Sequence, residues 1–281
     1  MINVVGIGNA GCQIAEDLSQ YPQYAIHKVD VGIPESGGSF PITKRSSPEE
    51  YEEKFSKRIF SDLKKIKGET LVIVAGGGAV SNCTLRVLEA FRGEKIQVLY
   101  IKPDTDFLSA GAQTLDKIVF GVLQQYARSG AIDKMYIVSN SHIEKVVGKI
   151  PLSSYYKQLN NIIASTFHML NVYRNTAPVV SSLAEAPSLS RISTIGIGTM
   201  ERVEDQMFFP LDFVTNKMYY FAINSARVDK DEDLLGKIKL RVKDEDPTVT
   251  TGFGVYSTSY EKDYIYIVAD AKIIQGVNYD E

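Results

Sequence analysis

Hydrophobic and polar residues in the first half of the chain fall into blocks that predict alternating strands and helices. The apolar block at 2–7 is continuous, which is typical of a parallel strand buried on both faces. Further strands are expected at 24–30, 70–75, 96–101 and 134–138. Helical patterns are expected at 11–20, from Pro48 to about Lys67, at 81–92 and at about 109–128, and a loop rich in Gly, Ser and Pro at 32–48. Strands that alternate with helices predict a parallel sheet with helices on both faces.

The pattern changes after Pro151. Apolar residues recur at helical spacing over 152–173, which predicts one long helix. Beyond it we expect strands at 192–197, 218–224, 252–258 and 263–271, with a helix near 231–244. The last two strands alternate apolar and polar residues, as a half-exposed antiparallel sheet does. The sequence therefore predicts an α/β protein in three parts: a Rossmann-like parallel-sheet domain at 1–150, a connecting helix at 151–174 and a smaller α+β domain at 175–281.

Composition excludes several classes of protein. The 281 residues are 44% hydrophobic and 23% charged, which is ordinary for a globular chain of one large or two modest domains. A formal net charge of −3 gives no field that would attract nucleic acid or an anionic membrane. No apolar run is long enough to span a bilayer, and no basic flank precedes the first apolar stretch. Cys12 and Cys83 are too few for a disulfide framework and lack metal spacing, so we expect a cytoplasmic protein.

A glycine-rich turn follows the first strand. Gly6 to Gly11 reads G-x-G-x-x-G, and Asp30 lies near the end of the next strand, where a Rossmann dinucleotide site has its ribose-binding acid. Taken alone, this spacing favours NAD or FAD. The alternative is a tight turn whose glycines serve only helix–sheet packing. We favour phosphate binding, because glycine lets the backbone approach an oxyanion and the N–H groups at a helix start complement its charge.

A second glycine-rich turn runs from Gly76 to Asn82, and a dinucleotide fold does not require it. Since both turns leave the carboxyl ends of parallel strands, they face the same rim of the sheet. Two amide-lined turns on one rim suit a di- or triphosphate held from both sides. The sequence contains no G-x-x-x-x-G-K-[ST] motif, so backbone N–H groups rather than a lysine would bind the phosphates.

The order of these motifs resembles the tubulin/FtsZ superfamily over nearly the whole chain. The helix at 152–173 takes the place of that family's central helix. The segments that carry the resemblance are, in chain order, the first phosphate loop "GNAGCQIA" (8–15), the signature loop "AGGGAVSN" (75–82), the FtsZ-like "IKPDTDF" (101–107) and "IDKMYIVSNSHIEKV" (132–146), and the first strand "STIGIG" (193–198) and closing hairpin "GFGVYSTSYEKDYIYIVADAK" (252–272) of the second domain.

The resemblance implies that the first domain binds GTP or GDP. The residues it places at the phosphates are Gly8, Asn9, Ala10, Gly11, Cys12 and Gln13 in the first turn and Gly76, Gly77, Gly78, Ala79, Val80, Ser81 and Asn82 in the second. Four of these, Asn9, Gln13, Ser81 and Asn82, could add hydrogen bonds to phosphate or to a bound Mg²⁺. Tyr156 would stack on the base, Asn161 or its neighbour Asn160 would pair with the base edge, and Asp104 lies where the family has ribose contacts. The family also implies head-to-tail filaments with the nucleotide between subunits.

Some features depart from the family pattern. In the signature loop, Val80 introduces a branched side chain and Asn82 replaces a closing glycine. The loop "PVVSSLAEAPSLS" (178–190) has Glu185 as its single acid, with Ser182 at the position of a second one, where the family has the acids that complete hydrolysis. We therefore expect slow hydrolysis at most, with Glu185 as the candidate catalytic residue. No extended tail is seen after the last strand, which favours a divergent, phage- or plasmid-type homologue.

Three hypotheses remain from the sequence. The first is a tubulin/FtsZ-like guanine-nucleotide-binding protein that assembles with itself, with no nucleic acid or membrane partner. The second is a degenerate relative that binds little or no nucleotide and acts as a structural or regulatory partner. The third is a Rossmann-type NAD(P) or FAD oxidoreductase, against which the second glycine turn and the lack of an evident acid–base pair count.

Overall fold

A largely parallel sheet forms the first half of the protein. The computed structural model describes residues 1–183, 189–201, 204–243 and 247–276. Its first strands are β1 (Ile2–Ile7), β2 (Tyr24–Val31), β3 (Ser39–Ile42), β4 (Thr70–Ala75), β5 (Ile96–Lys102) and β6 (Lys134–Ser139). They lie in the order β3-β2-β1-β4-β5-β6, and all neighbours run parallel. The predicted α/β class and the five predicted strands are confirmed.

The sheet continues into the second half. The strands there are β7 (Val180–Ser181), β8 (Ile192–Gly198), β9 (Gln206–Met207), β10 (Val214–Asn224), β11 (Thr250–Thr258) and β12 (Tyr264–Ala271). β8 pairs with β6, so the strands among the described residues form one 12-stranded sheet that runs on as β8-β12-β10-β11-β7. Because both halves share this sheet, the domain boundaries at 150 and 175 stay a prediction.

The closing hairpin predicted at 252–272 is wrong. β11 and β12 are not neighbours, because β10 lies between them, parallel to β11 and antiparallel to β12. Neither strand is half exposed along its length. Tyr256 and Val268 face the core shared with the long helix, while Phe253 and Ile267 face a second core on the other side. The alternation in the sequence therefore reflects two buried faces.

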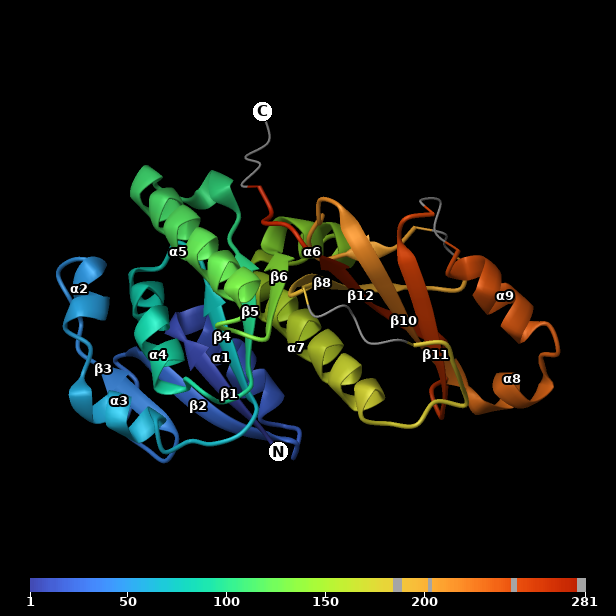
Figure 1. Ribbon diagram of the computed structural model, residues 1–281, viewed down its shortest axis with the longest axis horizontal. Coiled ribbons are helices and arrows are strands. Elements are labelled where there is room, and N and C mark those ends of the chain that lie inside the picture. Colours follow the sequence, from blue (N-terminus) through green and yellow to red (C-terminus); the bar gives the residue numbers. More distant parts are fainter. Residues whose placement is uncertain (184–188, 202–203, 244–246, 277–281) are drawn as a thin grey trace.

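Helices cover both faces of the sheet. On one face lie α3 (Lys57–Leu63), α4 (Thr84–Ala90) and α5 (Ala110–Ser129), which share one core cluster. On the other lie α1 (Gly8–Leu18) and α7 (Tyr155–Arg174). α7 is the predicted long helix, preceded by a short 3-10 helix, η3 (Leu152–Ser154). It packs on α1 and also on β8 and β12, so it connects the two halves (Figure 1).

Three local predictions need correction. The helix expected from Pro48 to Lys67 is two helices, α2 (Glu49–Glu53) and α3, because the backbone leaves helical geometry at Lys54 and Ser56 caps α3, its Oγ accepting from the Ile59 N–H at 3.4 Å. β3 lies inside the stretch predicted as loop, at the sheet edge, where Pro41 is tolerated. Helix α6 (Asn140–Val147) follows β6 and was not predicted.

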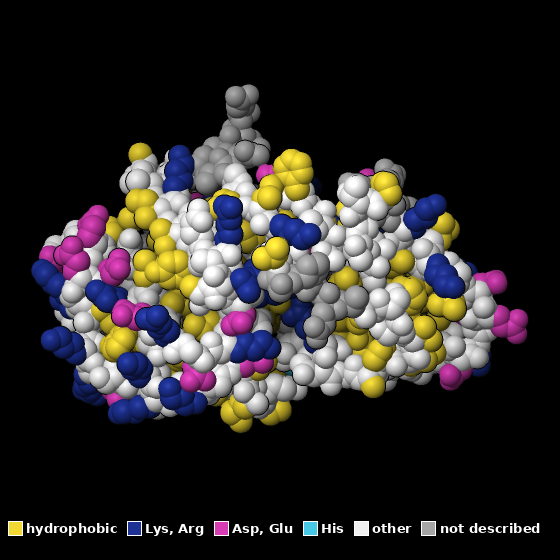
Figure 2. Space-filling model, in the orientation of Figure 1, with side chains coloured by type: hydrophobic (Ala, Val, Ile, Leu, Met, Phe, Trp, Pro, Cys, Tyr) yellow, Lys and Arg dark blue, Asp and Glu magenta, His cyan; other side chains and the backbone are white. Residues whose placement is uncertain are grey.

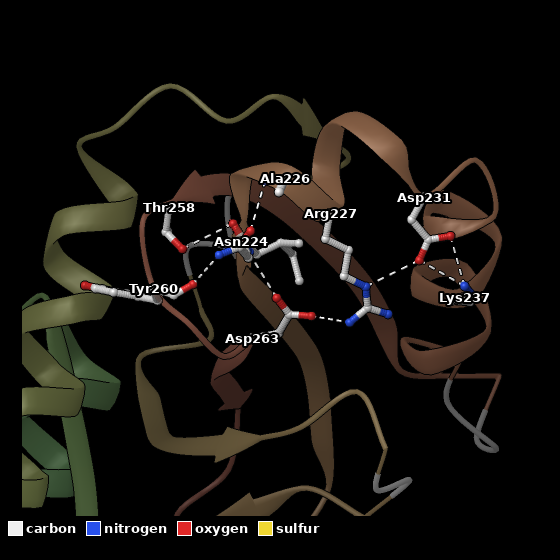
Figure 3. Close-up of polar contacts among 9 residues, drawn as sticks. Asn224, Ala226, Arg227, Asp231, Lys237, Thr258, Tyr260 and Asp263 are labelled. Atoms are coloured by element: carbon white, nitrogen blue, oxygen red, sulfur yellow. Dashed lines mark hydrogen bonds and ion pairs between the residues drawn. The ribbon is translucent and has the colours of Figure 1, made fainter.

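The helix expected near 231–244 is α9 (Leu234–Arg241), and the short helix α8 (Ser225–Lys230) that precedes it was not predicted. Polar contacts tie α8 to the turn before β12 (Figure 3). The Arg227 guanidinium pairs with both Asp231 and Asp263. Asn224 Nδ2 donates to the Tyr260 carbonyl at 2.6 Å. These contacts fix the end of β10 against the β11–β12 connection.

Lys and Arg side chains gather over α3 at one end of the molecule (Figure 2). Acidic neighbours pair with them: Lys65 Nζ lies 2.7 Å from Asp62 Oδ1, and Lys67 Nζ lies 3.3 Å from Glu94 Oε1. Exposed pairs of this kind add little stability. In the part of the chain that the structure describes, no helix is both long and apolar enough to cross a membrane.

Candidate functional site

The site begins at the carboxyl ends of two neighbouring strands. β1 and β4 are adjacent and parallel, with Ile7 opposite Val74, so the turns that follow them leave the same rim. α1 starts directly at Gly8, and its N-cap, Ile7, has extended backbone and makes no side-chain capping bond. The first turn of α1 contains no acid. Its uncapped N–H groups and the helix dipole therefore favour an anion at this point.

The glycines of the first turn serve different purposes. A Cβ atom on Gly6 would overlap the Gly11 carbonyl, and one on Gly11 would overlap the Ile73 carbonyl. These two glycines are needed for close packing of α1 on β1 and β4. Gly8 has a φ of 67°, in the left-handed region, so it sets the path of the turn itself.

The second turn presents open backbone to the same rim. Gly77 has a φ of 77°, and no atom lies within 4 Å of the place that a Cβ on Gly78 would take. The 3-10 helix η1 (Ala79–Cys83) starts next, with Gly78 as its N-cap. The Ser81 hydroxyl donates to the Gly78 carbonyl, and Asn82 Nδ2 donates to the Ala79 carbonyl at 3.0 Å. For Ser81 and Asn82 to bind phosphate or Mg²⁺, these hydrogen bonds to backbone carbonyls would first have to break.

Val80, in the second turn, brings its side chain close to Gly8 of the first turn. Its Cβ and Cγ1 are each 3.8 Å from the position that a Cβ on Gly8 would take, which is ordinary van der Waals contact. The Val80 side chain is half-buried and packs against the core below. The turns thus approach one another closely, and a branched side chain occupies part of the space between them.

α7 forms the next wall of the site. Asn160 Nδ2 donates to Gln13 Oε1 at 3.1 Å, and Gln13 Nε2 donates to Asn9 Oδ1 at 3.1 Å. Asn160 is 6% exposed, whereas Asn161 is exposed, one residue further around the helix. Asn160 therefore lies on the face of α7 that meets α1, and Tyr156 precedes it by one helical turn.

Tyr156 is an exposed ring at the start of α7. It is 61% exposed and stands edge-on to Tyr155, with ring centroids 5.1 Å apart. The Tyr155 hydroxyl donates to Glu144 Oε2 at 2.8 Å. Loss of solvation, the Glu144 carboxylate and the charge of Asp104 raise the pKa of Tyr155 to about 12. Most of the Tyr156 ring is therefore open to solvent, and Asp104 is close enough for its charge to act on Tyr155.

Cys12 and Cys83 are buried beside the two turns. Cys12 Sγ donates to the Gly6 carbonyl at 3.3 Å. Burial raises the pKa of both thiols to about 12, with a further contribution from the Asp30 carboxylate. Both are therefore uncharged packing residues. Among the described residues, no group of three His, Cys, Asp or Glu is placed to hold a metal ion.

No protein-family model matches the sequence, and no curated protein matches it. Solved structures match nearly the whole chain. FtsZ of M. jannaschii covers 99% of this chain and 88% of its own, at 13% identity and a TM-score of 0.66. A GTPγS-form protofilament of Bacillus thuringiensis serovar israelensis TubZ covers 96% and 86%, at 15% identity and a TM-score of 0.74. CetZ2 from Haloferax volcanii, a GTPγS-bound protofilament, covers 96% and 92%, at 15% identity and a TM-score of 0.69.

This chain has the tubulin/FtsZ fold. The resemblance inferred from the motif order is confirmed at the level of the fold, and identities of 13–15% make the chain a divergent example of it. A shared fold does not by itself establish a shared activity.

One predicted residue of this tubulin/FtsZ-fold chain cannot be placed. Glu185, the candidate catalytic acid, lies outside the residues that the structure describes. Ser182, three positions earlier, is held against the sheet: its N–H donates to the Phe253 carbonyl of β11 at 2.7 Å. The role of Glu185 stays a prediction.

Sequence reasoning missed the polar side chains beneath the second turn of the tubulin/FtsZ fold. Asp116 of α5 accepts hydrogen bonds from Tyr100 and Lys102, two residues on one face of β5. A signal was present in the sequence, because Asp116 stands four residues before Phe120 on the apolar side of α5. An acid on the buried side of a helix requires a partner, and Lys102 at the end of a buried strand requires one too.

Proposed function

We propose that this protein binds a guanine nucleotide across its two glycine turns and assembles head to tail into cytoskeletal filaments. The observation that carries the proposal is the close approach of the turns. They leave adjacent parallel strands, and Val80 of the second reaches within 3.8 Å of the Cβ position on Gly8 of the first. Backbone N–H groups from both turns can therefore reach one phosphate chain.

Each part of the nucleotide has a counterpart in the proposed site. The phosphates would meet the amides of Gly8 to Gln13 and of Gly76 to Asn82. The base would stack on Tyr156 and meet Asn160, which we prefer to Asn161 because it is the one that reaches the first turn. The ribose would lie near Asp104. Mg²⁺, if it accompanies the phosphates, would meet amide and hydroxyl oxygens of the turns rather than a cage of acids.

The solved structures support self-assembly as the second part of the proposal. Besides the two GTPγS protofilaments, they include GDP-form protofilaments of the same TubZ and helical models of two-stranded and four-stranded TubZ-Bt filaments. A head-to-tail contact that does not close on itself generates such filaments. We propose the same mode of assembly here, in the cytoplasm, with the bound nucleotide at the contact.

Hydrolysis in the proposed filament would be slow. Water attacking a phosphate must be oriented and polarised, and carboxylates do this better than hydroxyls. The loop at 178–190 contains Glu185 and, at the paired position, Ser182. We propose that Glu185 is the single acid that could act.

Sedimentation tests the proposal. The protein is centrifuged at high speed after incubation with GTPγS, GTP, GDP or no nucleotide, with Mg²⁺ present. We expect a pellet with GTPγS and GTP that is reduced with GDP and absent without nucleotide. Identical pellets under all four conditions would refute assembly linked to nucleotide.

A second candidate function rests on Val80. A protein of the same fold in which this side chain closes the gap between the turns would act as a structural or regulatory partner without nucleotide. Val80→Ala distinguishes the two, because it widens the gap by removing two methyl groups. Nucleotide-linked assembly predicts that the wild type and Val80→Ala both bind GTP, whereas the second candidate predicts binding by Val80→Ala alone.

A further inference from the structure

A buried ion pair lies directly beneath the second turn. Asp116 is completely buried, at 0% exposure. Its Oδ2 accepts from Lys102 Nζ at 2.9 Å, and its Oδ1 accepts from the Tyr100 hydroxyl at 2.6 Å. Lys102 Nζ also lies 4.2 Å from the centroid of the Phe120 ring. Buried charges of this kind add little net stability, because their desolvation offsets their attraction. Such a pair does, however, fix the relative position of the two side chains that it joins.

The second turn is built onto this pair. Gly76 has no room for a Cβ atom, because the Asp116 carboxylate and the Tyr100 hydroxyl occupy that space. The Gly76 N–H donates to the carbonyl of Ile101, between Tyr100 and Lys102 on β5, at 3.0 Å. A Cβ on Gly77 would come within 3.2 Å of Leu108 Cδ1, in the segment that leads into α5. The end of β5 and the start of α5 thus determine where the turn can run.

We propose that Asp116 is a positioning residue for the second glycine turn. Through Tyr100 and Lys102 it fixes the path of Gly76 to Gly78, and hence the direction of the amides that the turn presents. Asp116 itself touches no ligand, since it is fully buried below the turn. The consequence for phosphate rests on the proposed function: loss of the ion pair weakens the phosphate end of the site and leaves the base end at Tyr156 unchanged.

Asp116→Asn tests this, because it keeps the size of the side chain and removes the charge that holds Lys102. Asp270→Asn is the matched control: Asp270 is 1% exposed, pairs with Lys134 at 2.8 Å and lies on β12 in the other half. We expect hydrogen exchange of the Gly76 amide, which donates to the Ile101 carbonyl, to accelerate about tenfold in Asp116→Asn and to stay unchanged in Asp270→Asn. We also expect GTP affinity to fall about tenfold in Asp116→Asn, with no change in guanosine affinity.

The outcomes separate this inference from the proposed function. Unchanged exchange at the turn in Asp116→Asn, or equal acceleration in Asp270→Asn, overturns the positioning role. If the turn loosens in Asp116→Asn while the wild type binds no GTP, the positioning role stands and the proposed function fails. Tyr100→Phe, which removes one hydroxyl from the same network, gives the same readout with a smaller acceleration if Asp116→Asn does not fold.

Discussion

Asn160 of α7 and Gln13 of α1 are joined by a hydrogen bond of 3.1 Å, although 147 positions separate them in the sequence. Gln13 in turn donates to Asn9, in the first turn of α1. α7 packs on β8 and β12 as well as on α1. A chain of amide side chains therefore connects the first glycine turn with the helix on which the second half packs.

This connection predicts different effects for two adjacent residues. Asn160→Ala removes a buried donor, so we expect the free energy of unfolding to fall by about 1 kcal/mol. Asn161→Ala, on the exposed side, is the matched control and should change it by less than about 0.5 kcal/mol. Urea denaturation measures both. Equal effects would mean that the bond seen between α7 and α1 does not hold in solution.

The two glycine turns also predict different effects of an added methyl group. Gly11→Ala places a Cβ against the backbone carbonyl of Ile73, which cannot move aside, so we expect a loss of about 1–3 kcal/mol. Gly78→Ala meets nothing within 4 Å and should change stability by less than about 0.5 kcal/mol. Thermal unfolding of both variants checks the difference. A Gly11→Ala protein as stable as Gly78→Ala would contradict the packing described for α1.

Histidines whose rings are shielded from water predict that stability falls in mild acid. The two ring nitrogens of His27 are buried and have no hydrogen-bond partner among the described residues. Burial lowers the pKa of His27, and that of His168, below the usual 6.5. Below about pH 6.5 the unfolded chain therefore binds more protons than the folded one, so the stability present above that pH is lost as the pH falls toward the folded pKa.

His27→Leu tests this dependence. We expect its melting temperature to fall less than that of the wild type between about pH 7 and about pH 5. His168 still titrates in this variant, so a smaller decline should remain. The same decline in both proteins would show that His27 does not contribute to the loss of stability in acid.

The two thiols should be unreactive in the folded protein. Burial raises the pKa of Cys12 and Cys83 to about 12, so almost no thiolate exists near neutral pH. We expect both to resist a thiol-specific reagent in buffer and to react fully in denaturant. Rapid reaction of either thiol in buffer would show that the rim beside the turns opens.

The sequence predicts the first half of the fold better than the second, for a physical reason. β1 and β4 lie within a sheet covered on both faces, and apart from Asn3 and Thr70 their residues are apolar or glycine, which is typical of strands buried on both faces. β11 and β12 read as a half-exposed hairpin, because tyrosines such as Tyr256 and Tyr266 count as partly polar in the pattern although both contact the core. Which strand lies between them depends on pairing across the sheet, and local composition does not encode that.

The candidate site also contains residues that the sequence predicts and residues that it does not. Gly8 and Gly77 could be predicted because a left-handed backbone at a strand–helix turn demands glycine. Which of Asn160 and Asn161 faces α1 depends on the rotation of α7, so the sequence left both as candidates. The sequence places Asp116 on the apolar side of α5, but its position under Gly76 could not be predicted, since it depends on how α5 packs onto β5.

Titration calorimetry of GTP into nucleotide-free protein, with Mg²⁺, measures whether the two turns bind one polyphosphate. If the two turns hold one polyphosphate, GTP binds with micromolar or tighter affinity at one nucleotide per chain, and guanosine binds much more weakly. If GTP and guanosine bind equally, or GTP does not bind at millimolar concentration, the turns hold no phosphate and the proposed nucleotide site is refuted.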